Sequence, residues 1–339
     1  METVLSLIPL IAEKIRQAQH GLLVSENIYR NTHTFFGKNN WLFFIKPEIT
    51  QPLPSIKLEA ILELVLSKIE GFDFHIHDVK ILSADYLKQY DLIRQHYGVI
   101  DDVALLGRKA LTTKGKEKFL EIFGVPADDV KVLGGLEFLD EYPFFNAHSL
   151  DCLWQNSENQ KLASGTYAEK VRVDLETVYL LNAFHPRQLE HFTEKGRSIV
   201  VMNLSGDLAW RDARARFAGA TNPLKAEKGS LRRELLENKD TFGIPDVSQS
   251  YNGIHLSAGP VEALIELRRF ESDFSAQTGA LPFDAFPFGR QLMQAVGCIP
   301  GQVEQNALIQ AEGRRLSVFD LTEDMDADEA IRLLKQLIG

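Results

Sequence analysis

Segments with strand-like spacing alternate with segments of helical spacing, and this order most strongly constrains how the chain can fold. Residues 41–45 are a short, continuously apolar run, as expected for a buried strand. Residues 58–69 then carry apolar residues at helical spacing, and residues 72–82 alternate as a strand does. Ser83 is a suitable N-cap for a helix over 84–97.

A similar order returns after residue 183. We expect a helix over 186–194, a strand over 198–204, and a helix over 208–217. A short strand then leads to His255, and Pro260 is suited to the first turn of the following helix. The combined order predicts an α+β fold, a ferredoxin-like βαββαβ sandwich.

The stretch between these two blocks is too long for a loop and carries its own apolar residues, so we expect an inserted subdomain. Each end of the chain also extends beyond a minimal domain, with an amphipathic helix expected over 1–19, an added strand over 316–319 and a terminal helix over 326–337. The predicted organisation is an N-terminal helical extension (1–40), a first core part (41–98), an insertion (99–182), a second core part (183–275) and a C-terminal extension (276–339).

Charge and cysteine content exclude several classes of protein. The formal charge of -10 disfavours a nucleic-acid partner, because the mean field repels a phosphate backbone. The apolar residues near the N-terminus are closely flanked by charged ones, which argues against a membrane span. The two cysteines lie far apart in the sequence and provide neither a disulfide framework nor a set of metal ligands. This favours a reducing compartment, so we expect a cytoplasmic protein.

One region has the composition of a phosphate-handling site. His255 lies at the end of an apolar segment, directly before a helix N-terminus, where anions are favoured. A turn-rich element at 219–223 precedes a group of cationic and hydroxyl residues at 225–233. A lone histidine beside a helix is more often structural, and a basic run is more often a solvated face.

Several short motifs in one order resemble the nucleoside-diphosphate-kinase family from about Trp41 to Phe270. The matching residues are Ile45-Lys46-Pro47, His96-Tyr97, Thr221-Asn222-Pro223, Lys228-Gly229-Ser230-Leu231-Arg232, Asn252 with His255, Ser257, and Glu266 eleven residues after the histidine. Several matches in one order are far more specific than any single motif.

The resemblance implies a kinase that transfers the terminal phosphoryl group of ATP, or of another nucleoside triphosphate, to a nucleoside diphosphate. His255 would carry the group covalently, and Glu266 would orient its ring. Lys46, Arg232, Thr221 and Mg2+ would stabilise charge on the phosphates. The other nucleotide-binding residues implied are Tyr97, Phe184, Arg214, Asn252 and Ser257.

Each of these residues also has a structural interpretation. Lys46 could simply end a strand, Arg232 could form a surface ion pair, and Thr221 could be a turn residue. Asn252 is expected to bond sugar hydroxyls or nearby backbone. Tyr97 could be a core aromatic.

The chain departs from the family pattern at several positions. Ala258 replaces an aspartate near the metal, so magnesium binding would be weaker or rearranged. A family arginine falls on Ala215, and its neighbour Arg214 points about 100° away on a regular helix. The base-stacking aromatic could be Phe184 or lie within Pro143-Phe144-Phe145.

The loop over 235–250 is longer than the family's. The resemblance implies a homo-oligomer, but this loop contributes to subunit packing, so the family's common hexamer does not follow.

Three functions remain open. The first is an active nucleoside-diphosphate kinase. The alternative is a catalytically degenerate nucleotide-binding module, a sensor or scaffold that acts through its insertion. A third possibility is a kinase that forms the same phosphohistidine but passes the group to a protein or an unusual small molecule.

Overall fold

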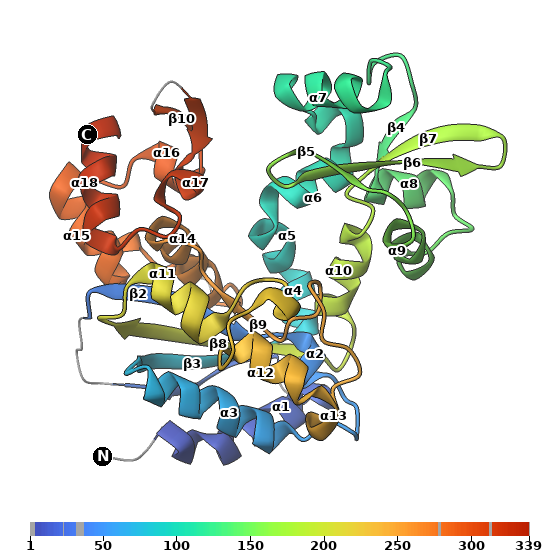
Figure 1. The fold of residues 1–339 in the computed structure, drawn as a ribbon. Helices are drawn as coiled ribbons and strands as arrows, with labels where there is room; N and C mark the ends of the chain where they lie inside the picture. Colours follow the sequence, from blue (N-terminus) through green and yellow to red (C-terminus); the bar gives the residue numbers. More distant parts are fainter. Residues whose placement is uncertain (1–3, 23, 32–36, 277–278, 312–313, 339) are drawn as a thin grey trace. The chain divides into compact units, whose positions relative to one another are not determined.

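Two compact units make up the chain. The computed structural model describes residues 4–22, 24–31, 37–276, 279–311 and 314–338. One unit combines Met1–Tyr90 with Lys195–Gly339, and the second unit is Asp91–Glu194 (Figure 1). The second unit contains all of the expected insertion, together with flanking helices that we expected in the core. None of the described helices is both long and apolar enough to cross a bilayer.

A five-stranded antiparallel sheet forms the centre of the first unit. The strands follow the order β1-β3-β8-β2-β9. After β1, the sheet continues with β3, β8, β2 and β9, which are the second, third, first and fourth strands of a βαββαβ unit. This strand order confirms the predicted ferredoxin-like fold. The strands are β1 (Ser25–Arg30), β2 (Asn39–Ile45), β3 (His75–Ser83), β8 (Ser198–Gly206) and β9 (Ile254–Leu256).

Helices cover both faces of this sheet. Phe43 faces the main apolar core, to which α1 and α3 contribute, and Figure 1 shows these two helices along one face. The next residue, Phe44, points to the opposite face and packs against Phe270 of α14, with ring centroids 5.7 Å apart. Because β2 is central and buried on both faces, its sequence is a continuous apolar run and does not alternate.

The remaining elements of the first unit are mostly short helices. They are η1 (Val4–Leu7), α1 (Ile8–Gln19), α2 (Pro47–Thr50), α3 (Leu58–Gly71), α4 (Ala84–Gln89), α11 (Trp210–Asp212), the π-helical turn η3 (Ala213–Ala218), η4 (Pro223–Lys225), α12 (Leu231–Glu237), α13 (Lys239–Phe242), α14 (Pro260–Glu271), η5 (Phe283–Ala285), α15 (Pro287–Val296), α16 (Gly301–Glu304), β10 (Leu308–Ala311), β11 (Arg314–Ser317), α17 (Val318–Thr322) and α18 (Ala327–Ile338).

Three expected elements need correction. The helix expected over 84–97 breaks after α4, because Asp91 adopts a left-handed conformation with φ 52°. The strand expected from residue 72 begins at His75, after a turn at Asp73 with φ 57°. The strand expected over 316–319 ends at Ser317, whose side chain caps α17. In addition, the extension over 1–40 contains β1, a strand that we did not expect.

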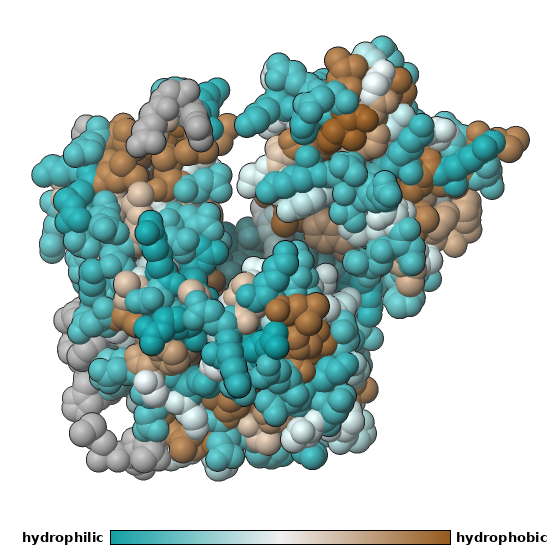
Figure 2. All heavy atoms as spheres, viewed as in Figure 1, coloured by the Kyte–Doolittle hydropathy of each residue, from teal (hydrophilic) through white to brown (hydrophobic). Residues whose placement is uncertain are grey.

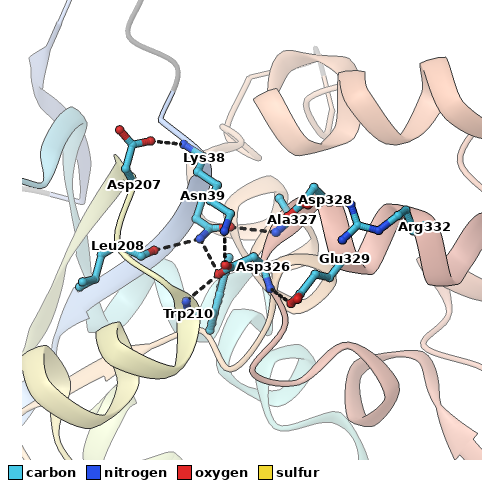
Figure 3. A network of polar contacts seen from close by, with 10 residues as sticks. All are labelled: Lys38, Asn39, Asp207, Leu208, Trp210, Asp326, Ala327, Asp328, Glu329 and Arg332. Atoms are coloured by element: carbon cyan, nitrogen blue, oxygen red, sulfur yellow. Dashed lines mark hydrogen bonds and ion pairs between the residues drawn. The ribbon is translucent and has the colours of Figure 1, made fainter.

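The C-terminal extension is fastened to the start of β2 through Asp326 (Figure 3). One carboxylate oxygen of Asp326 accepts hydrogen bonds from Trp210 N and Asn39 Nδ2, each 2.8 Å long. The Lys38 ammonium pairs with its other oxygen, and Asn39 Oδ1 accepts from Ala327 N at 2.8 Å. The extension is therefore part of the first unit's folded structure.

The second unit has its own sheet, in the order β4-β7-β6-β5, and two apolar clusters. Strands β6 and β7 form an antiparallel hairpin, and β4 pairs with β7 in parallel. Its elements are α5 (Leu92–His96), α6 (Gly98–Leu106), η2 (Gly107–Ala110), α7 (Thr113–Phe123), β4 (Val132–Gly134), α8 (Gly135–Glu141), α9 (Ala147–Gln155), β5 (Gln160–Ala163), β6 (Thr166–Val173), β7 (Glu176–Leu181) and α10 (His185–Thr193).

Glu169, on β6, is a fully buried carboxyl group within the second unit. It lies opposite Leu180 of β7, a member of the apolar cluster around Trp154. By hydrogen-bond geometry, neither of its oxygens accepts a bond from a described residue. Burial raises the pKa of Glu169 to about 7, and the nearby Ser157 hydroxyl opposes this rise.

Hydrophilic residues cover most of the surface visible in Figure 2, interrupted by small apolar patches. The exposed apolar side chains include Leu224 of the first unit and Leu175 of the second, which are 72% and 87% exposed. Apolar side chains that are exposed singly are common on soluble domains and do not indicate a binding site.

Candidate active site

His255 lies in the edge strand β9 and faces a buried carboxylate. Its Nε2 lies 3.1 and 3.0 Å from the two oxygens of Glu266 on α14, and its ring stacks on Phe44 at 4.6 Å. Glu266 is 2% exposed. Because an ionised carboxylate only accepts hydrogen bonds, this contact places a proton on Nε2 and the ring lone pair on Nδ1.

A second carboxyl group, Glu262, lies one helical turn before Glu266. Its Oε2 accepts a hydrogen bond from Ala258 N at 3.0 Å, at the start of α14. Burial, together with the neighbouring charge of Glu266, raises the pKa of Glu262 to about 8. This shift favours the protonated form of Glu262 beside Glu266. Glu262 was not among the expected site residues, although its spacing of four from Glu266 places both on one helix face.

Lys46 is a buried cation where β2 meets α2. Its Nζ donates to Asn252 Oδ1 at 2.9 Å, and its side chain is shielded enough that burial lowers its pKa to about 8. Glu48 opposes this shift, whereas the charge of Arg232 adds to it. An ammonium group at this position is desolvated and close to a second cation, which suits it to bind an anion.

Asn252 connects Lys46 to the loops around it. Its Nδ2 donates to the carbonyl oxygens of Thr221 and Gln249, each at 3.1 Å, while its Oδ1 accepts from Lys46. Its side chain is 2% exposed. We expected Asn252 to bond either sugar hydroxyls or nearby backbone, and the observed contacts are of the second kind.

Arg232, at the start of α12, links the same loops to β9. Its Nη1 donates to Gly219 O at 2.6 Å, and its Nη2 donates to Ile254 O at 3.2 Å, next to His255. Thr221 is exposed beside this group. The structure therefore gathers six of the expected residues in one region: Lys46, Thr221, Arg232, Asn252, His255 and Glu266.

Glu48 was not anticipated, yet it holds the loop that leads into β9. Its Oε1 accepts from Gly253 N at 2.7 Å. Gly253 has φ 83°, and a Cβ there would collide with Leu235 Cδ1 and lie 3.2 Å from Ile49 Cδ1. Glycine is therefore required on steric and conformational grounds. The usable signal was that Glu48 directly follows Lys46-Pro47.

Ser257 has a different environment from the one we expected. Its hydroxyl donates to Leu42 O at 3.1 Å and accepts from Leu42 N at 3.2 Å, and the residue is fully buried. In the structure this hydroxyl holds the end of β9 against β2. A nucleotide contact for Ser257 stays a prediction that no observed contact supports.

Arg214 is paired with the C-terminal extension. Its Nη1 donates to Glu323 Oε1 at 2.8 Å and to Asp324 Oδ1 at 2.7 Å. Burial acts to lower the pKa of Arg214, but the two carboxylates outweigh it and the net shift is upward. Arg214 therefore remains a cation whose charge is already balanced within the protein.

Tyr97 and Phe184 belong to the second unit. The Tyr97 ring meets His185 edge to face at 5.9 Å, and Phe184 packs against Trp154 at 5.6 Å. Phe144, in the alternative stacking segment, is 69% exposed. The nucleotide contacts expected of Tyr97 and Phe184 stay predictions.

The carboxylates around α14 are engaged in contacts within the protein. Mg2+ requires near-octahedral oxygen coordination and is often bound through substrate phosphates. Among the described residues of this region, each carboxylate already accepts hydrogen bonds from the histidine, from a backbone amide or from Arg214. The residues concerned are Glu262, Glu266, Glu323 and Asp324.

The arrangement has the parts needed to transfer an anionic group. A carboxylate fixes the tautomer of the imidazole, and hydrogen bonds connect the loops around it to a buried ammonium and a guanidinium. An oriented imidazole is a nucleophile, and preorganised cations stabilise charge that develops on phosphate oxygens.

The known proteins that are similar to this chain belong to one family. No family model matches the chain. Two solved nucleoside diphosphate kinases align weakly. The enzyme from Encephalitozoon cuniculi has 13% identity and a TM-score of 0.33, covering 72% of this chain and 95% of that one. The enzyme from Pyrobaculum aerophilum has 16% identity and a TM-score of 0.34, covering 68% and 94%.

The curated relative is more informative. A nucleoside diphosphate kinase from Nitrosomonas eutropha is 30% identical over 112 residues, which are 32% of this chain and 71% of the relative. This chain is therefore a member of the nucleoside diphosphate kinase family, enlarged by additional segments.

Proposed function

We propose that the protein transfers the terminal phosphoryl group of a nucleoside triphosphate to a nucleoside diphosphate through phosphorylated His255. The observation that carries this proposal is the contact between His255 Nε2 and Glu266, which commits Nε2 as a donor. Nδ1 is then the nitrogen that attacks. Family membership supports the same reaction.

In the first half-reaction, the Nδ1 lone pair attacks the terminal phosphorus in line with the bond to the bridging oxygen. That P–O bond breaks, its electron pair leaves with the nucleoside diphosphate, and an N–P bond forms. In the second half, a terminal oxygen of another nucleoside diphosphate attacks the same phosphorus and releases Nδ1. Glu266 stabilises the positive ring between the two steps.

Lys46 and Arg232 supply counter-charge for the phosphate oxygens in both halves, with Thr221 as a further donor. Asn252 keeps the Lys46 ammonium in place. Magnesium enters as part of the nucleotide substrate, because the carboxylates nearby are engaged within the protein.

The test is transfer of label from [γ-32P]ATP and magnesium to the protein, with GDP then added as acceptor. We expect an acid-labile, alkali-stable label that His255→Ala abolishes and that GDP removes as labelled GTP. His20→Ala, which alters an exposed histidine at the end of α1, is the matched control and should label normally. Labelling that persists in His255→Ala would disprove the assignment.

A degenerate nucleotide-binding module is the second candidate. It is favoured by Ala258, which replaces a family carboxylate, and by the engagement of Arg214 with the C-terminal extension. This candidate predicts ATP binding in equilibrium dialysis without any labelled protein. If label forms but GDP does not remove it, the group passes to a different acceptor.

A further inference from the structure

The π-helical turn η3 changes the position of Arg214. Gly219 N donates to Arg214 O at 2.9 Å, which closes a turn over five residues where an α-helix closes one over four. In the family pattern the arginine falls on Ala215, one residue after Arg214. The π-helical turn contains one residue more than an α-helical turn and so removes this difference of one position. Counted back from Gly219, Arg214 occupies the place that a regular helix would give to Ala215.

The same guanidinium is already bound by the chain's own acids. Glu323 and Asp324 share its Nη1, so two carboxylates face one cation. The three side chains are only partly exposed, at 31% for Arg214, 46% for Glu323 and 39% for Asp324. An approaching phosphate would have to compete with both carboxylates for Arg214, against their negative charge.

Glu323 and Asp324 lie close to residues that flank His255 and Glu266. Arg214 and Glu323 both act electrostatically on Glu262, which lies one turn before Glu266. Asp324 N also donates to Ala258 O at 2.9 Å, three residues after His255. The acid pair therefore contributes to the electrostatic field of the proposed phosphate site.

The segment that carries the acids is held in place on both sides. On one side, the Thr322 carbonyl packs closely against Gly259, where a Cβ would not fit. On the other side, Asp326 bonds Trp210 and Asn39, as Figure 3 shows. Glu323 and Asp324 are thus fixed beside Arg214 and do not belong to a loose tail.

We propose that Glu323 and Asp324, from the C-terminal extension, set the nucleotide affinity of the site by competing with phosphate for Arg214. This inference rests on the proposed function, because it requires that a nucleoside triphosphate binds with its phosphates near His255. It assigns the extension a role in substrate binding that neither the motif pattern nor family membership indicates.

The experiment measures ATP affinity by calorimetry with magnesium at low salt, in the full chain. Glu323→Gln/Asp324→Asn should bind ATP about fivefold more tightly, the size expected from partly exposed ion pairs. Arg214→Gln alone should weaken ATP binding, because it leaves the carboxylates of Glu323 and Asp324 without their cation beside the proposed phosphate site. Adding Arg214→Gln to the double variant should abolish its gain.

The matched control is Asp328→Asn, which removes an exposed ion pair with Arg332 in the same extension. It should leave ATP affinity unchanged. The gain of the double variant should shrink in 0.5 M KCl, because added salt screens exposed charges. Circular dichroism checks that each variant is folded, and Glu323→Gln alone, with a smaller gain, carries the test if the double variant does not fold.

The possible outcomes separate the two proposals. No tighter binding in the acid-pair variants, or a gain that survives Arg214→Gln, would overturn the inference while labelling of His255 still supports the kinase. Absence of ATP binding in the wild type and in all variants would overturn the proposed function and this inference with it.

Discussion

Replacing Glu169 with glutamine is expected to change the stability of the second unit, relative to wild type, more favourably at alkaline pH than at acidic pH. The folded protein holds this carboxyl in an apolar cluster, where burial raises its pKa from 4.5 to about 7. The folded state therefore binds the proton more tightly than the unfolded state. The stability that protonated Glu169 contributes to the folded unit is fully present below about pH 4.5. It is lost as the pH rises through about 7.

The size of the effect follows from the pKa difference. Each pKa unit corresponds to about 1.4 kcal/mol, so the raised pKa of Glu169 lowers the stability of the folded unit, relative to its low-pH value, by about 1 kcal/mol at pH 5 and about 3 kcal/mol at pH 8. Glutamine cannot ionise. It has its own cost, because a buried amide needs hydrogen bonds, but that cost is the same at both pH values.

The measured quantity is the change in unfolding free energy caused by Glu169→Gln, compared between pH 5 and pH 8. Urea titrations followed by 19F NMR of 5-fluorotryptophan isolate the second unit, because Trp154 is its only tryptophan. We expect the variant to gain about 2.5 kcal/mol relative to wild type between these pH values.

Glu158→Gln is the control for this prediction. It removes an exposed glutamate in the turn before β5, so the same comparison should give a difference near zero. Parallel pH dependence in wild type and Glu169→Gln would refute the argument, because it would mean that Glu169 titrates alike in the folded and unfolded states.

Two further predictions concern the first unit. Burial lowers the pKa of Lys46 to about 8, so its charge is lost as the pH rises through that value. We therefore expect kcat/KM for ATP to fall above pH 8, and we expect Lys46→Gln to remove this decrease from the pH profile. Gly253→Ala should cost about 3 kcal/mol in urea unfolding, because its Cβ would overlap Leu235. Gly229→Ala shares the positive φ, but its Cβ would meet only Lys68 Nζ, at 4.0 Å, so about 1 kcal/mol is expected, and equal losses would contradict the steric argument.

Local patterns in the sequence were sufficient to predict most of the core. The run over 41–45 is apolar because β2 is covered on both faces, and the helical spacing over 58–69 matches α3. In β3, Ile76 and Val79 both face the core although they are three residues apart, because a bulge between them shifts the alternation.

The parts that could not be predicted depend on distant contacts or on backbone detail. Arg214 meets Glu323 and Asp324, which lie 109 and 110 residues further along the chain, and no periodicity connects them. The π-helical turn that positions Arg214 ends in a hydrogen bond from Gly219 N to Arg214 O, a backbone detail that the sequence pattern does not indicate. A motif specifies which residue types are present, whereas the partners of each side chain follow only from the folded chain.

Strand β1 has a consequence for how copies of the chain can associate. It pairs with β3 from Ser25 to Arg30, along the flank that a four-stranded βαββαβ sheet would leave open. The backbone groups that β3 would offer to a neighbouring molecule are thus largely satisfied from within. A second copy could pair directly with β3 only after β1 had detached, so strand addition onto β3 itself requires displacement of the N-terminal segment.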